Sequence, residues 1–215
     1  MYQKGELKRE QILAAAKRLF YEKGYEDTTI KEIAQGSDSP VGLVHYYFQK
    51  KQDIVAAIYM DFHNSIDVLI YHQMPEVTGD IFLTHALNNR IYYQIIASVP
   101  QNARLYLEMM KNKSNAKLVA KYASMIYHTY IAQYEVDWSE EELRAYVSFN
   151  FGARREFFLD YLSGAYQMDV QDGVTMLLGL FPRLMKLEHA YVDQVLAHSL
   201  ELLHKIDYSG LKFLV

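Results

Sequence analysis

The chain has 215 residues, of which 51% are hydrophobic and 22% are charged, with a formal net charge of −4. This balance is typical of a globular protein and excludes intrinsic disorder over the whole chain. The absence of cysteine excludes disulfides, thiolate catalysis, and zinc or iron–sulfur centres held by cysteine. The longest apolar run, counting Thr and Gly, is 174–181, far short of the roughly 18 residues of a membrane span. Because the first residues are charged and lack an apolar signal core, we expect a soluble, cytoplasmic protein without membrane contacts.

Helix breakers are scarce, with 10 glycines and 4 prolines, which favours long helices over many short strands. Apolar residues recur at helical spacing along most of the chain, and no run alternates for long enough to form a sheet. The sequence therefore predicts an all-α fold with about nine or ten helices. The chain also carries 19 tyrosines, whose hydroxyl groups need partners wherever the rings are buried.

Three short helices are predicted within the first fifty residues. An apolar face that includes Ile12 and Phe20 marks a helix over 6–24, which Gly24 ends. Thr29 and Glu32 have the spacing of a capping box and open a second helix. A turn follows at 36–38, and the third helix is expected to start at Pro40 with Ser39 as its cap.

The rest of the chain predicts longer helices separated by short breaks. The expected helices cover 53–72, 81–98, 100–111, 116–134, 139–164 and 169–206, with a loop at 75–80, a polar connector at 112–115 and a kink or split at Pro182. Ser139 and Glu142 form a second capping-box pattern.

The N-terminal layout is that of a helix-turn-helix, in which one helix crosses the phosphate backbone and the next enters the major groove. Residues 1–51 hold nine Lys and Arg against seven Asp and Glu, whereas the remainder holds 13 against 19, so an anionic partner suits this end. The hydroxyl and N–H groups of Thr28 and Thr29 can meet a phosphate. The small start of the third helix lets the backbone approach base edges, and polar-tipped rings and two lysines follow: Ser39, Pro40, Val41, Gly42, His45, Tyr46, Tyr47, Lys50 and Lys51.

Several segments, occurring in the same order along the chain, resemble the DNA-binding domain of the TetR family of transcriptional regulators. Segments 10–20, 23–25, 28–30, 33–34 and 42–48, followed by Lys51, read EQILAAAKRLF, KGY, TTI, IA and GLVHYYF. The resemblance covers about residues 8–55. It implies a repressor that binds DNA as a homodimer and is released by a small molecule, with a DNA-binding domain at 1–52 and a ligand-binding and dimerisation domain at 53–215. The residues themselves show no catalytic constellation and no His-Glu-x-x-His zinc motif, so we expect no enzyme activity, no cofactor and no metal.

Carried over by position, the resemblance places Thr28 and Thr29 at the start of the second helix and Pro40, Val41 and Leu43 on the base-facing side of the third. It implies that His45 and Tyr47 stand at family aromatic positions and that Lys51 contacts the DNA backbone. The turn departs from the family pattern, because Ser37-Asp38-Ser39-Pro40 replaces Ala-Gly-Val-Ser. Asp38 can adopt the left-handed conformation that glycine would supply, so the turn is expected to form. Serine in place of a buried valine loosens the packing under the third helix and leaves the base preference open.

The second domain is rich in rings and methionines, and some of them are expected to line a cavity of ~300–1,000 Å³ for an apolar or aromatic ligand, the others being core. The candidate ligand-binding residues are Phe62, His63, His85, Asn88, Tyr92, Arg104, Met109, Tyr127 and Phe151. Further interior candidates are Phe82, Tyr93, Tyr106, Met110, Tyr122, Met125 and Phe149, with His128 as another polar group.

Two apolar stripes in the last helices suit a four-helix dimer interface, although the same stripes could pack on the core of one protomer. They consist of Leu143, Val147, Phe158 and Leu162, and of Val195, Leu196, Leu202 and Leu203. A helical small-molecule carrier or adaptor without DNA binding is the main alternative function. A di-iron enzyme is disfavoured, since Glu201 and His204 form the sequence's one Glu-x-x-His pair, and such a centre needs two with further glutamates.

Overall fold

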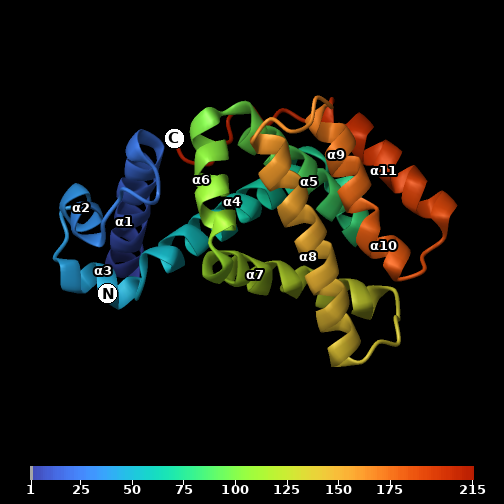
Figure 1. The fold of residues 1–215 in the computed structure, drawn as a ribbon, viewed down its shortest axis with the longest axis horizontal. Coiled ribbons are helices and arrows are strands. Elements are labelled where there is room, and N and C mark those ends of the chain that lie inside the picture. Colours follow the sequence, from blue (N-terminus) through green and yellow to red (C-terminus); the bar gives the residue numbers. More distant parts are fainter. Residues whose placement is uncertain (1) are drawn as a thin grey trace.

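The computed structural model describes residues 2–215, except for the side chains of 2–4 and 117–124. Over this range the chain forms eleven α-helices, one 3₁₀-helix and no strand, so the all-α prediction is confirmed (Figure 1). The helices are α1 (Tyr2–Lys23), α2 (Ile30–Gly36), α3 (Val41–Tyr47), α4 (Lys51–Gln73), η1 (Pro75–Gly79), α5 (Ile81–Ser98), α6 (Pro100–Lys111), α7 (Lys113–Gln133), α8 (Glu140–Leu162), α9 (Val170–Leu178), α10 (Leu180–Leu184) and α11 (His189–Leu203). None of the helices described is long and apolar enough to cross a membrane.

The N-terminal helices end and begin largely where the sequence indicates. Gly24 stops α1 with a φ of +92°, and its N–H donates to the carbonyl of Phe20 at 3.0 Å. The capping box of Thr29 and Glu32 is present at the start of α2. Asp38 has a φ of +46°, so it takes the left-handed conformation expected of it in the turn.

The predicted cap of α3 is wrong. Pro40 itself is the cap residue, with an extended backbone, and no side chain caps this helix. The hydroxyl of Ser39 lies one residue too early to cap it and donates instead to the carbonyl of Ser37 at 3.1 Å. Ser37 is buried, and its hydroxyl donates to the carbonyl of Ile33 at 2.8 Å, so the turn between α2 and α3 is held by its own serines.

α1, α2 and α3 form a small unit at one end of the molecule around a shared apolar centre (Figure 1). The centre contains Ile12, Phe20, Ile33, Val44 and Phe48, each at most 5% exposed. α4 follows α3 after only three residues and runs from this unit into the larger helical body. A rigid helix therefore connects the two parts.

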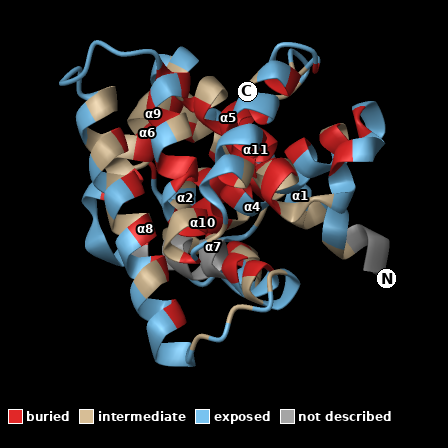
Figure 2. Ribbon diagram, turned by 90° about the vertical axis from the view of Figure 1, so that its right-hand side faces the viewer, coloured by how far each residue is buried: buried red, intermediate tan, exposed pale blue. Residues whose placement is uncertain are grey.

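α5 is the central helix of the larger body and packs against α4, α6, α9 and α11. Its buried residues form much of the core seen in red in Figure 2. Arg90 on α5 is completely buried, and its guanidinium donates to Ser199 Oγ at 2.8 Å, to Thr175 Oγ1 at 2.9 Å and to the carbonyl of Leu196 at 3.0 Å. These bonds tie α5 to α9 and α11.

Several predicted boundaries in the larger body are wrong. Residues 75–79 form η1 rather than a loop, and the connector at 112–115 shrinks to Asn112, whose side chain caps α7. Segment 169–206 breaks at Gly179 and again at 185–188, which raises the number of helices above the expected nine or ten. Pro182 lies inside α10 without ending it, because the first turn of a helix does not use the N–H group that proline lacks.

The two apolar stripes predicted for a dimer interface pack within the protomer. Leu162 is half-buried, and the other stripe residues are each at most 8% exposed: Leu143, Val147, Phe158, Val195, Leu196, Leu202 and Leu203. The side chains of the stripe residues other than Leu162 are therefore unavailable to a second protomer, and the core alternative holds for them.

Candidate functional site

The outward surface of α2 and α3 carries most of the residues predicted to contact DNA, at the free end of the molecule (Figure 1). Tyr46 is 79% exposed and Val41 is 42% exposed. The other exposed members are Thr29, Pro40, Gly42 and His45, while Ser39, Leu43 and Tyr47 are half-buried. A Cβ at Gly42 would meet nothing within 4 Å, so α3 begins with a small, open surface.

Thr28 is not part of this surface, contrary to the prediction. Its side chain is 1% exposed, and its hydroxyl donates to the carbonyl of Gly24 at 2.6 Å. Burial of this hydroxyl closes the loop between α1 and α2 and leaves it no reach toward a phosphate. Thr28 therefore stabilises the loop that precedes α2 and is not itself exposed on the surface.

Lys51 also differs from the prediction, because its ammonium group is already hydrogen-bonded within the chain. Nζ donates to the carbonyls of Tyr25, Glu26 and Thr28, the last at 2.6 Å, and lies 4.2 Å from the centre of the Tyr25 ring. Burial lowers the pKa of Lys51, against the opposing effect of Glu108 and other carboxylates. Lys51 thus latches the α1–α2 loop, and a direct phosphate contact would have to break one of these bonds.

The polar groups of Thr29 are engaged as well. Its N–H donates to the carboxylate of Glu32 at 2.9 Å, and its hydroxyl donates to the same carboxylate at 2.7 Å. Hydrogen bonds from Lys23 and then from Thr29 lower the pKa of the Glu32 carboxyl to about 2. Glu32 is therefore ionised and paired with Lys23, and the hydroxyl and N–H groups of Thr29 are already hydrogen-bonded to it, whereas the side chains of His45 and Tyr46 on α3 are exposed.

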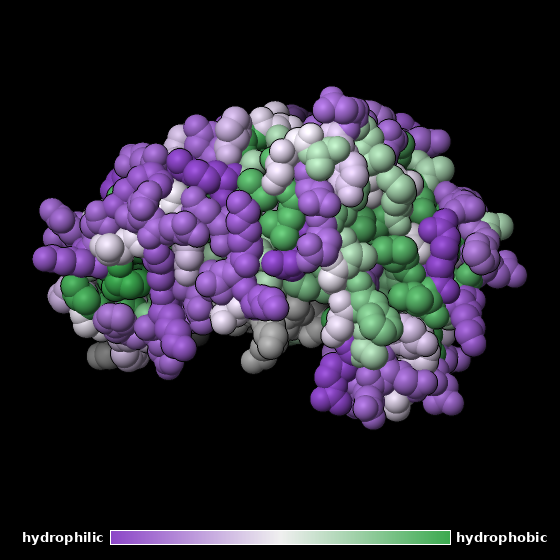
Figure 3. Space-filling model, viewed as in Figure 1, coloured by the Kyte–Doolittle hydropathy of each residue, from purple (hydrophilic) through white to green (hydrophobic). Residues whose placement is uncertain are grey.

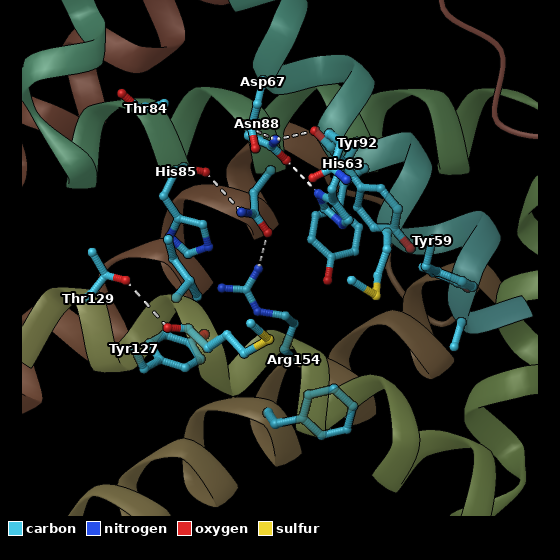
Figure 4. A pocket seen from close by; sticks show the side chains of 18 of the residues that line it. Tyr59, His63, Asp67, Thr84, His85, Asn88, Tyr92, Tyr127, Thr129 and Arg154 are labelled. Atoms are coloured by element: carbon cyan, nitrogen blue, oxygen red, sulfur yellow. Dashed lines mark hydrogen bonds between the residues drawn. The ribbon is translucent and has the colours of Figure 1, made fainter. Parts of the chain in front are cut away.

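A cavity of about 540 Å³ lies in the larger body among α4, α5, α6, α7 and α8 (Figure 4). Its wall combines six tyrosine or phenylalanine rings and three methionines with ten polar or charged side chains. The described lining residues are Ala56, Tyr59, Met60, His63, Asn64, Asp67, Ile81, Thr84, His85, Asn88, Asn89, Tyr92, Tyr93, Tyr106, Met110, Met125, Ile126, Tyr127, Thr129, Phe151, Arg154 and Arg155.

Six of the nine predicted ligand-binding residues line this cavity: His63, His85, Asn88, Tyr92, Tyr127 and Phe151. The other three do not line it. Phe62 packs into the core against Phe213, Met109 is completely buried in the core, and Arg104 faces the N-terminal unit.

The further interior candidates also divide. Tyr93, Tyr106, Met110 and Met125 line the cavity, whereas Phe82 is core and Phe149 and His128 are exposed. The side chain of Tyr122 lies outside the part of the chain described.

The polar groups of α4 and α5 form a hydrogen-bonded row along the cavity wall. His63 Nδ1 lies 2.6 Å from Asn88 Oδ1, and Asn88 Nδ2 donates to Asp67 Oδ1 at 2.6 Å. Because an amide oxygen can only accept, His63 must donate from Nδ1. Figure 4 shows this row above the open space.

Burial governs the ionisation of these groups. It lowers the pKa of His63, and it lowers the pKa of His85 to about 3, in both cases with a further contribution from the positive charge of Arg154. Burial also raises the pKa of Asp67, although the bond from Asn88 opposes this effect. Both histidines are therefore neutral near pH 7.

Arg154 is a cavity residue that the sequence prediction missed. It is only 9% exposed, and its Nη1 donates to Asn89 Oδ1 at 2.7 Å. A signal was present, because Arg154 falls at helical spacing on the buried stripe of α8 that contains Leu143, Val147 and Phe158. In Figure 4 its guanidinium reaches from α8 toward His85 and His63.

α6 lies between the cavity and the N-terminal unit. On one side, Tyr106 and Met110 line the cavity. On the other, Arg104 Nη2 donates to the carbonyls of residues 20 and 21 at 3.1 and 2.7 Å, and Glu108 Oε2 accepts the N–H of Tyr25 at 2.6 Å. Gly24 leaves no room for a side chain here, since a Cβ at this position would lie 2.7 Å from Glu108 Oε1.

The N-terminal unit is similar in sequence to known regulators. The family model described as "Bacterial regulatory proteins, tetR family" matches residues 12–58. The HTH-type transcriptional regulator HbdR of Aromatoleum sp. (strain CIB) is 36% identical over 80 residues, which are 37% of this chain and 32% of HbdR. The match thus spans about a third of that relative's length.

Comparison with solved structures extends the similarity to the whole fold. RolR in complex with resorcinol matches with a TM-score of 0.60 and 15% identity, covering 92% of this chain and 96% of RolR. A tetR-family transcriptional regulator from Streptomyces coelicolor matches with a TM-score of 0.51 and 19% identity, covering 91% and 89%. Segment 12–58 is therefore similar in sequence to the tetR family of bacterial regulatory proteins, and the chain as a whole shares the fold of these solved structures.

Proposed function

We propose that the protein is a ligand-responsive transcriptional repressor that binds a pseudo-palindromic operator as a homodimer and is released by a small apolar or aromatic effector. Residues 1–52 are the proposed DNA-binding domain, and residues 53–215 the proposed ligand-binding and dimerisation domain. The observation that carries this proposal is the exposed surface of α3, which stands on a tight turn within the segment that matches the TetR family.

The proposed DNA contacts follow the exposure of the side chains. Pro40, Val41 and Gly42 allow close approach to base edges, and His45 and Tyr46 reach bases or phosphates from the same helix. Thr29, Ser39, Leu43 and Tyr47 lie at the edge of this contact. Thr28 and Lys51 support DNA binding indirectly in this proposal, because their hydrogen bonds hold the loop that leads into α2.

The proposed effector site is the cavity of about 540 Å³, a volume within the usual range for small-molecule sites. Its wall of rings and methionines favours an aromatic or apolar molecule, and its row of polar groups can orient that molecule. The structural neighbour RolR was solved in complex with resorcinol, an aromatic compound, which supports the same class for this cavity.

Release from DNA would follow from movement of the helices shared by the cavity and the N-terminal unit. α4 carries cavity residues from Tyr59 to Asp67 and begins at the latch residue Lys51. α6 contacts the cavity through Tyr106 and the α1–α2 loop through Glu108. A ligand that changes the tilt of these helices changes the separation of two α3 helices in a dimer. Coupling of ~1–3 kcal/mol would alter DNA affinity by roughly 5- to 150-fold.

A homodimer is proposed because a helix-turn-helix pair can bind half-sites roughly 34 Å or a multiple apart. The stripes of α8 and α11 are buried, so the interface must use outward-facing residues instead. Met176 and Leu180 are 52% and 37% exposed. Figure 3 shows hydrophobic residues gathered over the neighbouring surface of α8 to α10.

A gel-shift titration at stated salt tests the DNA-binding proposal, using the fragment that flanks the protein's own coding region and random DNA as competitor. The wild type should prefer the fragment, and Tyr46→Ala should lose that preference without loss of folding, because Tyr46 is so exposed. Tyr71→Ala is the matched control, since Tyr71 is 62% exposed but lies on α4 away from α3. A wild type that binds ligands but shows no preference for the fragment would favour the carrier alternative.

A further inference from the structure

Resting on the proposed function, we propose that the effector is an aromatic carboxylate whose carboxylate group pairs with Arg154 and whose ring occupies the tyrosine- and methionine-rich part of the cavity. Two features support this assignment: the charge balance of the cavity, and the groups that remain free to receive an anion.

Arg154 brings a positive charge into the cavity that the described residues do not neutralise. Its Nη1 donates to the neutral amide oxygen of Asn89, and its guanidinium lies 5.8 Å from the centre of the Tyr93 ring. None of the ion pairs within the described part of the chain involves Arg154. A buried cation without an anionic partner is costly, and the site gains most from a ligand that supplies the missing charge.

The other ionisable groups of the cavity do not serve as that partner. Among its described lining residues Asp67 is the sole carboxylate, and it is hydrogen-bonded to Asn88 on α5. His63 and His85, which face Arg154 from α4 and α5, are neutral near pH 7, since their pKa values are lowered. The region around Arg154 therefore lacks one negative charge.

The charge deficit fits a monoanion better than a phosphate. Arg155 also borders the cavity, but its Nε donates to the carbonyl of Met110 at 2.8 Å and its Nη1 pairs with Glu156. A single guanidinium can hold both oxygens of a carboxylate side by side. A phosphate, with up to two charges, would need a second free cation, and the other arginine of the described lining, Arg155, is already bonded to Met110 and Glu156.

The rest of the wall favours a ring on that carboxylate. Tyr92, Tyr93, Tyr106, Tyr127 and Phe151 surround the space that Arg154 enters. Aromatic pairs gain from edge and stacked contacts beyond the burial of area, and methionines such as Met110 adapt to a ring of varying shape. The cavity is roomy enough for one or two rings.

The test measures binding by calorimetry in the absence of DNA, with matched pairs of ligands of equal shape. The probes are benzoate, 3-phenylpropionate and 2-naphthoate, each compared with its primary amide, at pH 7. The proteins are the wild type, Arg154→Gln and the control Arg144→Gln, which removes an exposed charge on the same helix outside the cavity lining. Circular dichroism and thermal melting check that each variant is folded.

We expect at least one carboxylate to bind the wild type about tenfold or more tightly than its amide, as a charge-assisted hydrogen bond implies. Arg154→Gln should bring the ratio close to one, and Arg144→Gln should leave it within about threefold of the wild-type value. Equal or tighter binding of the amides, a ratio unaffected in Arg154→Gln, or no binding of any probe would overturn the proposal. If Arg154→Gln does not fold, the comparison of acid with amide on the wild type decides alone. Failure of the gel-shift test with a positive result here would reject the repressor and keep the carboxylate site.

Discussion

Replacing Lys51 with methionine tests whether this side chain is a structural latch or a phosphate contact. The substitution keeps the length of the side chain and removes the three bonds to the carbonyls of Tyr25, Glu26 and Thr28. A buried hydrogen bond from a charged donor contributes about 1.5–3 kcal/mol, but an exposed charge contributes less than about 1 kcal/mol. Because Lys51 is half-buried, we expect a total loss of about 2 kcal/mol, or about 4–8 °C in Tm for a chain of this size.

The assay combines thermal melting with DNA titrations at several salt concentrations. Lys51→Met should melt earlier, whereas the fully folded fraction should bind DNA with the wild-type dependence on salt. Lys50→Met is the control, since Lys50 is adjacent and exposed. If Lys50 contacts a phosphate, its loss should lower the slope of log K against log salt by about one and leave Tm within about 1 °C. A Lys51→Met protein with wild-type Tm and a reduced slope would refute the latch.

Three further changes probe the loops and the cavity. In the wild type, stability should fall as the pH drops from 6.5 toward 4, because His85 binds a proton when unfolded but not when folded, where its pKa is about 3; His85→Gln should reduce this dependence on pH. Thermal melting across this range should show the wild-type dependence in the control His128→Gln. Equal dependence on pH in all three proteins would contradict the burial of His85. Gly24→Ala should lower the free energy of unfolding by about 1–2 kcal/mol, since φ is +92° and the new Cβ would meet Glu108. A denaturant midpoint equal to that of the wild type would show that Gly24 and Glu108 are not tightly packed. Asp38→Gly should leave the free energy of unfolding within about 0.5 kcal/mol of the wild type, whereas Asp38→Val should lower it by about 1–2 kcal/mol. Denaturant unfolding measures both, and a valine variant more stable than the glycine variant would contradict the left-handed turn.

Local rules predicted the features that depend on neighbouring residues. The capping boxes of Thr29 with Glu32 and of Ser139 with Glu142 need only three intervening peptide units, and both are present. Asp38 likewise takes its left-handed conformation within its own turn. Ser39 shows the limit of such rules. α3 begins one residue later than expected, so the hydroxyl of Ser39 bonds to the carbonyl of Ser37 in the turn and does not cap the helix.

Long-range contacts decided the features that the sequence did not predict. The partners of Lys51 lie more than twenty residues earlier in the chain, so a lysine expected to reach DNA is held by a loop. Arg104 lies on α6 two residues from the cavity position Tyr106 but faces the opposite way, toward α1. Arg154 follows Ala153 and precedes Arg155 in a run that resembles an exposed helix surface, and only the stripe across all of α8 places it inside.

Hydroxyl-radical footprinting of the fragment that flanks the coding region tests the central claim most directly, because it reports groove contact and two-fold pairing in one measurement. We expect two protected patches on one face of the duplex, separated by roughly 10 base pairs or a multiple, and both lost in Tyr46→Ala. A single patch, uniform weak protection, or protection that survives Tyr46→Ala would contradict DNA recognition by paired α3 helices.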